Sequence, residues 1–520
     1  MNTPNRRLRR VCAASLAVTA SLALLGSAPA PAPAPAPARH SAGERPVNLA
    51  HLGTYAGDKA EIVAYDWTTR RAYVTTADGL ALDVLDVRDP AKPVKIASVD
   101  LSVYGSGAVT SVDARRGLVA AAVESADAAE RGKVVLMRPD GTVIKAVTVG
   151  HSPDMVTFTG DGRRLLVANE GEPVGYQPGE ADPEGSVSIV ALDRGADRAT
   201  VRTAGFRAFD HRRLDPSVRI SGPGATVAQD LEPEYISVSE DGRSAFVTLQ
   251  ENNAVATVDL RSARVTAIDG FGYKDHSRPG NGLDTSDRDD AIRIEPRPIQ
   301  GVYMPDALAA FEHRGRTYYV VANEGDEREY GKGEAKYADG IRLADLDPAL
   351  LPAGFDRSLL AETEIGRLQI IKPAAAGDPV RTYGGRSFSI RDAEGRLVYD
   401  SGDLLERLIA KIDPANFNAE GEGDFDKRSD NKGPEPEGLA IGEVDGRLMA
   451  FVAIERTNGV MVFDIGDPRR PVFQNWVRTA GDESPEGLEY VPAWQSPTHR
   501  PMLAVANEGT GTTSFYTITR

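Results

Sequence analysis

The chain has 520 residues, a formal net charge of −16 and one cysteine, Cys12. Such an acidic protein is repelled by nucleic acid and by anionic membranes, so we expect neither as a partner. Cys12 lies in a predicted leader, which excludes disulfides, thiolate metal sites and cysteine nucleophiles from the mature protein. The seven histidines show no metal-ligand spacing, which argues against a zinc site.

The first residues have the pattern of a secretion signal. Arginines at positions 6, 7, 9 and 10 precede an apolar stretch of 15 residues, Val11–Leu25, which is too short to span a bilayer. We predict a signal peptide over 1–30, cut as late as 38, and a Pro/Ala-rich linker over 31–46. No later stretch is long and apolar enough to cross a membrane. The sequence therefore predicts an exported protein, either secreted or held at the cell surface.

From residue 47 onward a unit of short strands recurs. Each unit opens with alternating residues, as in Tyr235–Ser239, and continues with a hairpin signal such as Asp241-Gly242. The second run is nearly continuous, as in Tyr318–Ala322, which is typical of a strand covered on both faces. A third strand follows in most units, for example Val187–Leu192. Seven units, with a basic spacing of 46 to 49 residues, predict an all-β fold.

The most economical arrangement of these units is a seven-bladed β-propeller over 47–520 with long loop insertions. We expect Val47–Tyr55 to supply the outer strand of the last blade, beside Ser514–Thr519, and so to close the ring. A solenoid is the alternative, which the lack of capping repeats disfavours. The insertions cover about 270–298 and 327–432. The second is expected to contain an extra hairpin, Ser387–Ile390 with Leu397–Asp400, and a helix near Leu404–Ile412.

Carboxylates recur at fixed places in the units. In six units one acid precedes the first strand and another follows the second, and in the seventh Ala108 replaces the first acid. Because the second strand of a hairpin returns to where the first began, both acids should lie at one face, around the mouth of the central channel. The predicted set is Glu61, Asp78, Glu124, Asp154, Glu170, Glu234, Glu251, Asp306, Glu324, Glu437, Glu455, Glu486 and Glu508.

A ring of carboxylates must stay solvated, hold protons or bind cations. Two bare charges about 5 Å apart repel by roughly 3 kcal/mol at an effective dielectric near 20. Oxygen-only ligands with several carboxylates suit Ca²⁺, which we predict as the bound ion. The alternative is purely structural, with each acid capping the amides of nearby loops. Asp287 and Asp289, in the first insertion, are candidates for a second calcium loop, and here the alternative is a solvated acidic loop.

Longer motifs outside the simple repeat are specific enough to compare with known families. They are Leu283–Asp289, Tyr303–Ala307, Ala322–Asp326, Ser387–Ile390 with Val398–Asp403, and Arg428–Gly438. With them the chain resembles the choice-of-anchor I family over 47–520, a family that includes mesenchyme-specific cell-surface glycoproteins associated with biomineralisation. The resemblance implies an exported propeller, often attached to a surface. Some bacterial members are described as alkaline phosphatases, and calcium-dependent propeller phosphatases and phytases offer an analogy of fold.

Two functions follow from the resemblance and the predicted ring. The first is calcium-assisted hydrolysis of a small phosphorylated substrate, in which the cation bridges the phosphate and lowers the pKa of an attacking water. Arg328, Arg428 and Lys432 lie beside the acidic motifs and are candidate phosphate ligands, with ion pairs to neighbouring acids as the alternative. The second function is a non-catalytic propeller that binds cations or a surface ligand outside the cell. The sequence identifies no catalytic residue.

Overall fold

The computed structural model describes residues 45–57, 59–76, 79–333 and 336–520. The predicted signal peptide, most of the linker and Asp78 lie outside the described residues. Almost every regular element in the described part is a strand, with only two α-helices, α1 (Val227–Asp230) and α2 (Leu404–Ile412). The predictions of an all-β protein and of a helix near 404–412 are confirmed. Short 3₁₀ helices cover Ala196–Arg198, Arg207–Phe209, Leu343–Asp345, Arg357–Leu360, Pro414–Asn416 and Glu455–Thr457.

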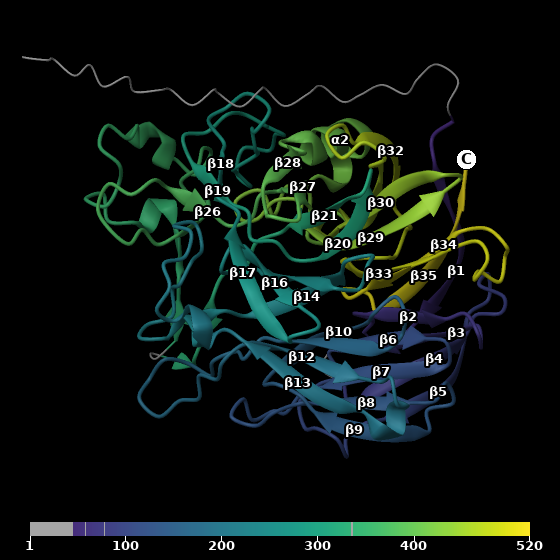
Figure 1. Ribbon diagram of the computed structural model, residues 1–520. Coiled ribbons are helices and arrows are strands. Elements are labelled where there is room, and N and C mark those ends of the chain that lie inside the picture. The colour runs from purple at the N-terminus through teal and green to yellow at the C-terminus, as the bar shows by residue number, and fades with distance from the viewer. Residues whose placement is uncertain (1–44, 58, 77–78, 334–335) are drawn as a thin grey trace, which may run out of the picture. The chain divides into compact units, whose positions relative to one another are not determined.

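Five of the sheets consist of four consecutive antiparallel strands each (Figure 1). Tight turns with left-handed residues, such as Gly162 and Gly242, join the first two strands, as the Asp-Gly signals predict. The first three sheets contain β2 (Val63–Asp66), β3 (Arg71–Thr75), β4 (Ala81–Asp86), β5 (Val94–Asp100); β6 (Ser111–Arg115), β7 (Leu118–Val123), β8 (Lys133–Met137), β9 (Val143–Thr148); and β10 (Pro153–Phe158), β11 (Arg164–Asn169), β12 (Ser186–Ala191), β13 (Thr200–Gly205). The other two contain β14 (Pro233–Val238), β15 (Ser244–Leu249), β16 (Ala254–Asp259), β17 (Arg264–Gly270); and β29 (Pro436–Val444), β30 (Arg447–Ile454), β31 (Gly459–Asp464), β32 (Val472–Val477).

The two ends of the described chain share a further four-stranded sheet. Its order is β1 (Asn48–Ala56), β35 (Thr512–Thr519), β34 (Met502–Asn507) and β33 (Pro485–Val491). Strand β1 runs antiparallel to β35, with Asn48 opposite Thr519 and Ala56 opposite Thr512. This confirms that the segment near residue 47 completes the last repeat.

The remaining four-stranded sheet corrects one prediction. Its strands are β20 (Leu308–His313), β21 (Arg316–Asn323), β27 (Ser387–Asp392) and β28 (Leu397–Asp400), so the expected extra hairpin supplies the third and fourth strands of a repeat. Because β21 is buried, its backbone needs a hydrogen-bonded strand on both edges. Strand β20 pairs with one edge and β27 with the other, where Val320 lies opposite Ile390. The second insertion is therefore two excursions, one between β21 and β27 and one between β28 and β29.

The first strands of these seven sheets contact one another in a cycle. Each first strand contacts the next in the order β2, β6, β10, β14, β20, β29, β33, and β33 contacts β2. Residues from all seven strands line one cavity of about 260 Å³. Apolar side chains fill the space between neighbouring sheets, for example Leu166 and Val187 with Val247 and Ala256. The main core is thus divided into layers between successive sheets.

The insertions pack together into a separate layer. Its five-stranded sheet has the order β18 (Tyr273–Asp275), β19 (Gln300–Val302), β26 (Arg381–Thr382), β25 (Gln369–Ile371) and β24 (Gly340–Arg342). A two-stranded ribbon, β22 (Glu329–Tyr330) with β23 (Tyr337–Ala338), lies in the chain between β19 and β24. This layer has its own hydrophobic core, which includes Leu283, Leu343, Leu368 and Ile370. The two long loops therefore carry structure that holds their polar residues in place.

Candidate functional site

The repeated acids lie at one end of their sheets. In four units the first acid is the second residue of the first strand, as Glu234 is in β14, and Glu61 and Asp306 stand two residues before theirs. In five units the second acid directly follows the second strand, as Glu455 follows β30. A recurring backbone bond ties the two positions together: Glu170 donates to the carbonyl of Ser152 at 2.9 Å, and Glu508 donates to Ser484 at 2.8 Å. Each accepting residue stands two positions before the first acid of its unit. The two acids of a pair therefore share a face, as the strand order predicts.

A common local geometry directs the first acid of several units. In four sheets the strand register shifts just after a proline, which places a β-bulge at Asp154, Glu234, Glu437 and Glu486. A bulge re-aims the side chain that it carries. The residue before the proline has a left-handed backbone in three of these sheets, with φ of 43° at Ser152, 49° at Glu435 and 51° at Ser484. Such residues cost on the order of 1–3 kcal/mol each and tend to occur at functional sites.

Two glycines allow neighbouring sheets to bring their acids together. Gly487 donates from its amide to the carbonyl of Glu61 at 3.1 Å. A Cβ on Gly487 would lie 2.5 Å from the same carbonyl oxygen, and a Cβ on Gly438 would lie 1.7 Å from the carbonyl oxygen of Glu486. Only glycine permits these approaches. As a result three acids from different sheets interact, because Glu486 raises the pKa of Glu437 and Glu61 raises that of Glu486.

Burial and mutual repulsion raise the pKa values of the ring acids. Burial, and after it Glu61 and other carboxylates, raises the pKa of Asp154 to about 8. Burial raises the pKa of Glu251 to about 7 although Arg328 opposes the shift. For Glu234 the carboxylates that add to burial are Glu251 of its own repeat and acids from two other repeats, Asp306 and the pair Glu170 and Asp154. The same causes raise the pKa values of Glu170, Glu234, Asp306, Glu437 and Glu486 well above their usual range, and burial raises that of Glu124.

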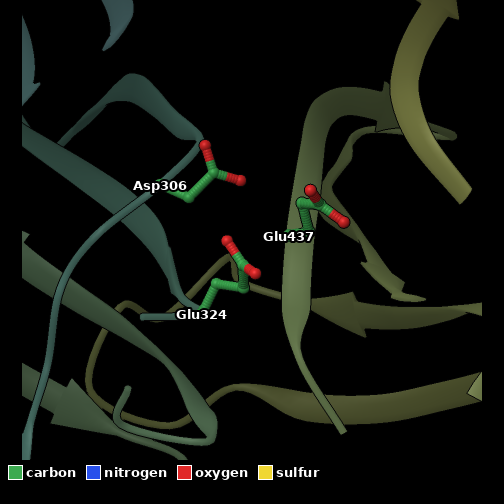
Figure 2. Close-up of side chains that lie close together, drawn as sticks. All are labelled: Asp306, Glu324 and Glu437. Atoms are coloured by element: carbon green, nitrogen blue, oxygen red, sulfur yellow. The ribbon is translucent and has the colours of Figure 1, made fainter. Parts of the chain in front are cut away.

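Two groups of three acids converge in the described residues, and the first is Asp306, Glu324 and Glu437. One carboxylate oxygen from each lies within 4.8 Å of the others, and Figure 2 shows the three side chains converging from separate segments. Gln250 donates to Glu324 Oε2 at 2.8 Å. Glu437 Oε2 is buried and has no hydrogen-bond partner among the described residues, and the same holds for Oε2 of Glu251. Both oxygens of Glu324 thus have donors, since Lys432 donates to Oε1, whereas the buried oxygen of Glu437, which has no donor in the described part of the chain, is the kind of ligand that a hard cation requires.

A second group, Glu324, Glu435 and Glu455, is also within 4.8 Å but contains its own positive charges. Lys432 Nζ lies 2.6 Å from Glu324 Oε1 and 3.3 Å from Glu435 Oε2. Burial alone would raise the pKa of Glu435, but Lys432 and two arginines outweigh it and lower the pKa to about 2. The two groups share Glu324. Lys432 and Arg456 form ion pairs with the acids of the second group, whereas in the first group, among the residues that the structure describes, only Glu324 has such a partner.

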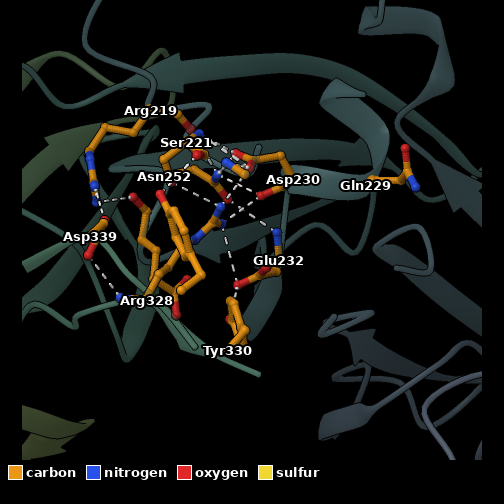
Figure 3. Close-up of polar contacts among 12 residues, drawn as sticks. Arg219, Ser221, Gln229, Asp230, Glu232, Asn252, Arg328, Tyr330 and Asp339 are labelled. Carbon is orange, nitrogen blue, oxygen red and sulfur yellow. Dashed lines mark hydrogen bonds and ion pairs between the residues drawn. The ribbon is translucent and has the colours of Figure 1, made fainter. Parts of the chain in front are cut away.

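The three predicted phosphate ligands are all ion-paired. Arg328 donates to Asp230 Oδ1 and to the Asp230 carbonyl, both at 2.7 Å, within the polar network of Figure 3. Its side chain is 0% exposed, so it cannot reach a phosphate. Arg428 Nε lies 2.8 Å from Glu435 Oε1, and Lys432 is paired as described above. All three residues therefore form the ion pairs with neighbouring acids that were the alternative to phosphate binding.

The predicted second calcium loop lies away from the ring, in the insertion layer. Asp287 Oδ1 accepts a 2.8 Å bond from Arg367, and Asp289 Oδ2 accepts a 3.2 Å bond from Arg293. The side chains of Asp287 and Asp289 are only 6% and 9% exposed, so neither carboxylate is freely solvated, whereas Asp290 of the same loop is exposed. The first of these bonds links the first insertion to the second, and the other lies within the first.

Four acids next to the predicted ones escaped the sequence prediction: Glu172, Glu232, Asp326 and Glu435. Glu172 and Asp326 raise the pKa values of ring acids, and Glu232 and Glu435 are buried beside the ring. Each stands two residues from a predicted acid, across a glycine or a proline, in Glu-Gly-Glu, Glu-Gly-Asp and Glu-Pro-Glu. These short motifs are the signal that would have found them. Of the predicted acids, Glu508 is exposed.

Comparison with known proteins adds two relatives. The chain is 30% identical to Gigasin-3a of Magallana gigas over 182 residues, which is 30% of this chain and 63% of that protein. It is 28% identical to the mesenchyme-specific cell surface glycoprotein of Strongylocentrotus purpuratus over 305 residues, or 51% of this chain and 39% of that protein. The chain therefore spans less than two thirds of the length of either relative.

Two solved structures superpose on most of the chain. The Cps50 (Swd1) β-propeller domain of Myceliophteria thermophila has a TM-score of 0.46 at 10% identity, over 91% of this chain and 100% of that one. Hydrazine synthase of Kuenenia stuttgartiensis has a TM-score of 0.47 at 12% identity, over 90% and 97%. Among the described residues no helix has the length and apolarity needed to cross a membrane. The choice-of-anchor I domain model matches residues 61–468, and this protein therefore belongs to the choice-of-anchor I domain family.

Proposed function

We propose that this protein is an exported, cell-surface β-propeller that binds Ca²⁺ in its carboxylate ring and acts as a non-catalytic binding module. The seven four-stranded sheets are its blades. The cyclic contacts of their first strands and the cavity that all seven line support a closed ring. The sea-urchin relative, whose name places it at the cell surface, supports the location. The leader predicted over 1–30 provides the route of export.

The observation that carries the cation site is the group Asp306, Glu324 and Glu437. Their oxygens converge within 4.8 Å, and Glu437 Oε2 is buried without a donor among the described residues. If the three acids only capped loop amides, their oxygens would point at N–H groups, and the unpartnered oxygen of Glu437 does not. A bound Ca²⁺ satisfies these oxygens and removes the mutual repulsion that raises their pKa values.

Calcium titration of the chelator-stripped protein by isothermal calorimetry tests this proposal. We expect the wild-type chain to bind Ca²⁺ and Glu437→Gln to bind it at least about tenfold more weakly, a loss of about 1.4 kcal/mol. Glu443→Gln is the matched control, because Glu443 is an exposed acid near the other end of the same strand. Absence of binding over a wide calcium range would leave the capping alternative.

Hydrolysis of a phosphorylated substrate is the weaker candidate. The three basic residues expected to hold the phosphate are engaged by carboxylates, and Arg328 is fully buried. A protein that binds Ca²⁺ but turns over neither phosphomonoesters nor phosphodiesters would fit the proposed binding module. Calcium-dependent turnover that Glu437→Gln abolishes would favour the hydrolase instead.

A further inference from the structure

Lys432 places a positive charge inside the carboxylate ring. Its Nζ lies 2.6 Å from Glu324 Oε1, 3.3 Å from Glu435 Oε2 and 3.4 Å from Asp326 Oδ1. We propose that Lys432 is a tethered cation that occupies the Glu324–Glu435–Glu455 group and confines metal binding to the Asp306–Glu324–Glu437 group. This inference rests on the proposed cation-binding ring and adds to it which carboxylates are open to metal.

The position of Lys432 is built by its neighbours in the chain. Asp430, two residues earlier, pairs with Arg342 at 3.0 Å and with Arg367 at 2.9 Å. The carbonyl of Asn431 accepts a 2.8 Å bond from the buried Arg386. On the other side the Gly433 amide donates to the Arg428 carbonyl at 2.9 Å. The backbone around the lysine is therefore held on both sides.

The local charge count agrees with this role. In the ionised form that metal binding requires, Glu324, Asp326, Glu435 and Glu455 contribute four negative charges to this group, in which the Lys432 side chain is 12% exposed. Arg428 pairs with Glu435, and Arg456 pairs with Glu435 and Glu455. Without Lys432 four carboxylates would face two guanidinium groups. The two uncompensated negative charges equal the charge of one divalent cation, so the ammonium stands where a metal ion would otherwise be favoured.

Glu324 makes the two positions interdependent. It is the member common to both carboxylate groups, and its Oε1 is the closest partner of the ammonium. A cation beside Asp306 and Glu437 must share this carboxylate with Lys432, which weakens both interactions. Removal of the ammonium should therefore open the second position and also strengthen the first.

Calorimetric titration of chelator-stripped Lys432→Met with CaCl₂ tests the inference. We expect one more Ca²⁺ per chain than in the wild type. Lys336→Met is the matched control, because Lys336 lies in the other excursion, between β21 and β27, is 45% exposed and pairs with Glu329. The control should keep the wild-type stoichiometry. An unchanged stoichiometry in Lys432→Met, with the protein folded, overturns the inference.

Stability measurements cover the case in which Lys432→Met folds poorly. If a metal ion can replace the ammonium, the variant should recover its folded circular dichroism spectrum in calcium and lose it in chelator. A variant that stays unfolded in both has lost a purely structural lysine, which overturns the inference. The proposed function fails separately, through a wild-type protein that binds no Ca²⁺. Binding by Lys432→Met alone would refute that proposal and overturn the confinement of metal to the Asp306–Glu324–Glu437 group, while it would support the occupation of the second group by the lysine.

Discussion

Gly438 lies against the carbonyl oxygen of Glu486 so closely that a Cβ on the glycine would be 1.7 Å from it. This contact joins the first strands of two successive sheets at the point where each carries a ring acid. Glu437 precedes the glycine, and burial together with neighbours that include Glu486 raises its pKa. Backbone packing between sheets, and not side-chain pairing, thus sets the spacing of the carboxylates.

The first prediction concerns this approach. Gly438→Ala must push the two strands apart, and overpacking of this kind typically costs about 1–3 kcal/mol. We expect a melting temperature lower by several degrees and weaker calcium binding, because Glu437 and Glu486 are displaced together. Gly160→Ala is the control, since nothing lies within 4 Å of a Cβ built there. Equal melting temperatures for the two variants would contradict the close-packed geometry.

The second prediction separates cation binding from structural capping through Glu437→Gln. In chelator at pH 8 glutamine replaces either a protonated carboxyl or a charge that Glu455, Glu324 and Glu486 repel, so we expect the variant to melt at or above the wild-type temperature. In excess calcium the order should reverse, because the wild type gains about 2.7 kcal/mol at 100 times its Kd and the variant gains less. A capping role would instead make the variant less stable in both conditions. Differential scanning calorimetry measures all four states.

The third prediction is a pH dependence of the ion-free protein. Because the folded pKa values of Asp154 and Glu455 are raised to about 8 and that of Glu251 to about 7, the folded state holds protons that the unfolded state has released. Their contribution to stability is full below the usual carboxyl pKa values near 4 and is lost as pH rises to about 8. In chelator we expect the melting temperature to fall from pH 5 to pH 8.

Calcium should oppose this fall, because its ligands must be deprotonated to bind. The calcium-induced rise in melting temperature is therefore expected to grow with pH over the same interval. A melting temperature that is flat from pH 5 to pH 8 in chelator would mean that the ring acids are not stabilised in their protonated form.

The fourth prediction assigns Arg328 to folding. Its buried guanidinium joins the insertion to Asp230 and Glu232, and removal of one partner from such a pair typically costs about 3–5 kcal/mol. Arg328→Met should therefore lower the melting temperature strongly and expose the 329–342 segment to limited proteolysis. Arg243→Met, which removes an exposed arginine 3.6 Å from Asp241, should do neither. An Arg328→Met protein as stable as the wild type would contradict the structural role of Arg328.

The amino-acid sequence alone determined the features of this protein that depend on neighbours along the chain. Strand alternation, Asp-Gly turns and the acid at each strand end recur locally, so the repeat, the all-β class and the shared face of each acid pair could be predicted. Even the pairing of β1 with β35 followed from the strand missing in the last repeat.

The tertiary structure alone decided which acids are compensated, because Lys432 and Glu324 are far apart in the chain and meet only through the folded insertion. It also decided that β27 pairs with β21, since the extended residues of Ser387–Asp392 fit an isolated hairpin and a sheet equally well. Charge compensation and strand partnership act through space, and their energies depend on distances that no local pattern encodes.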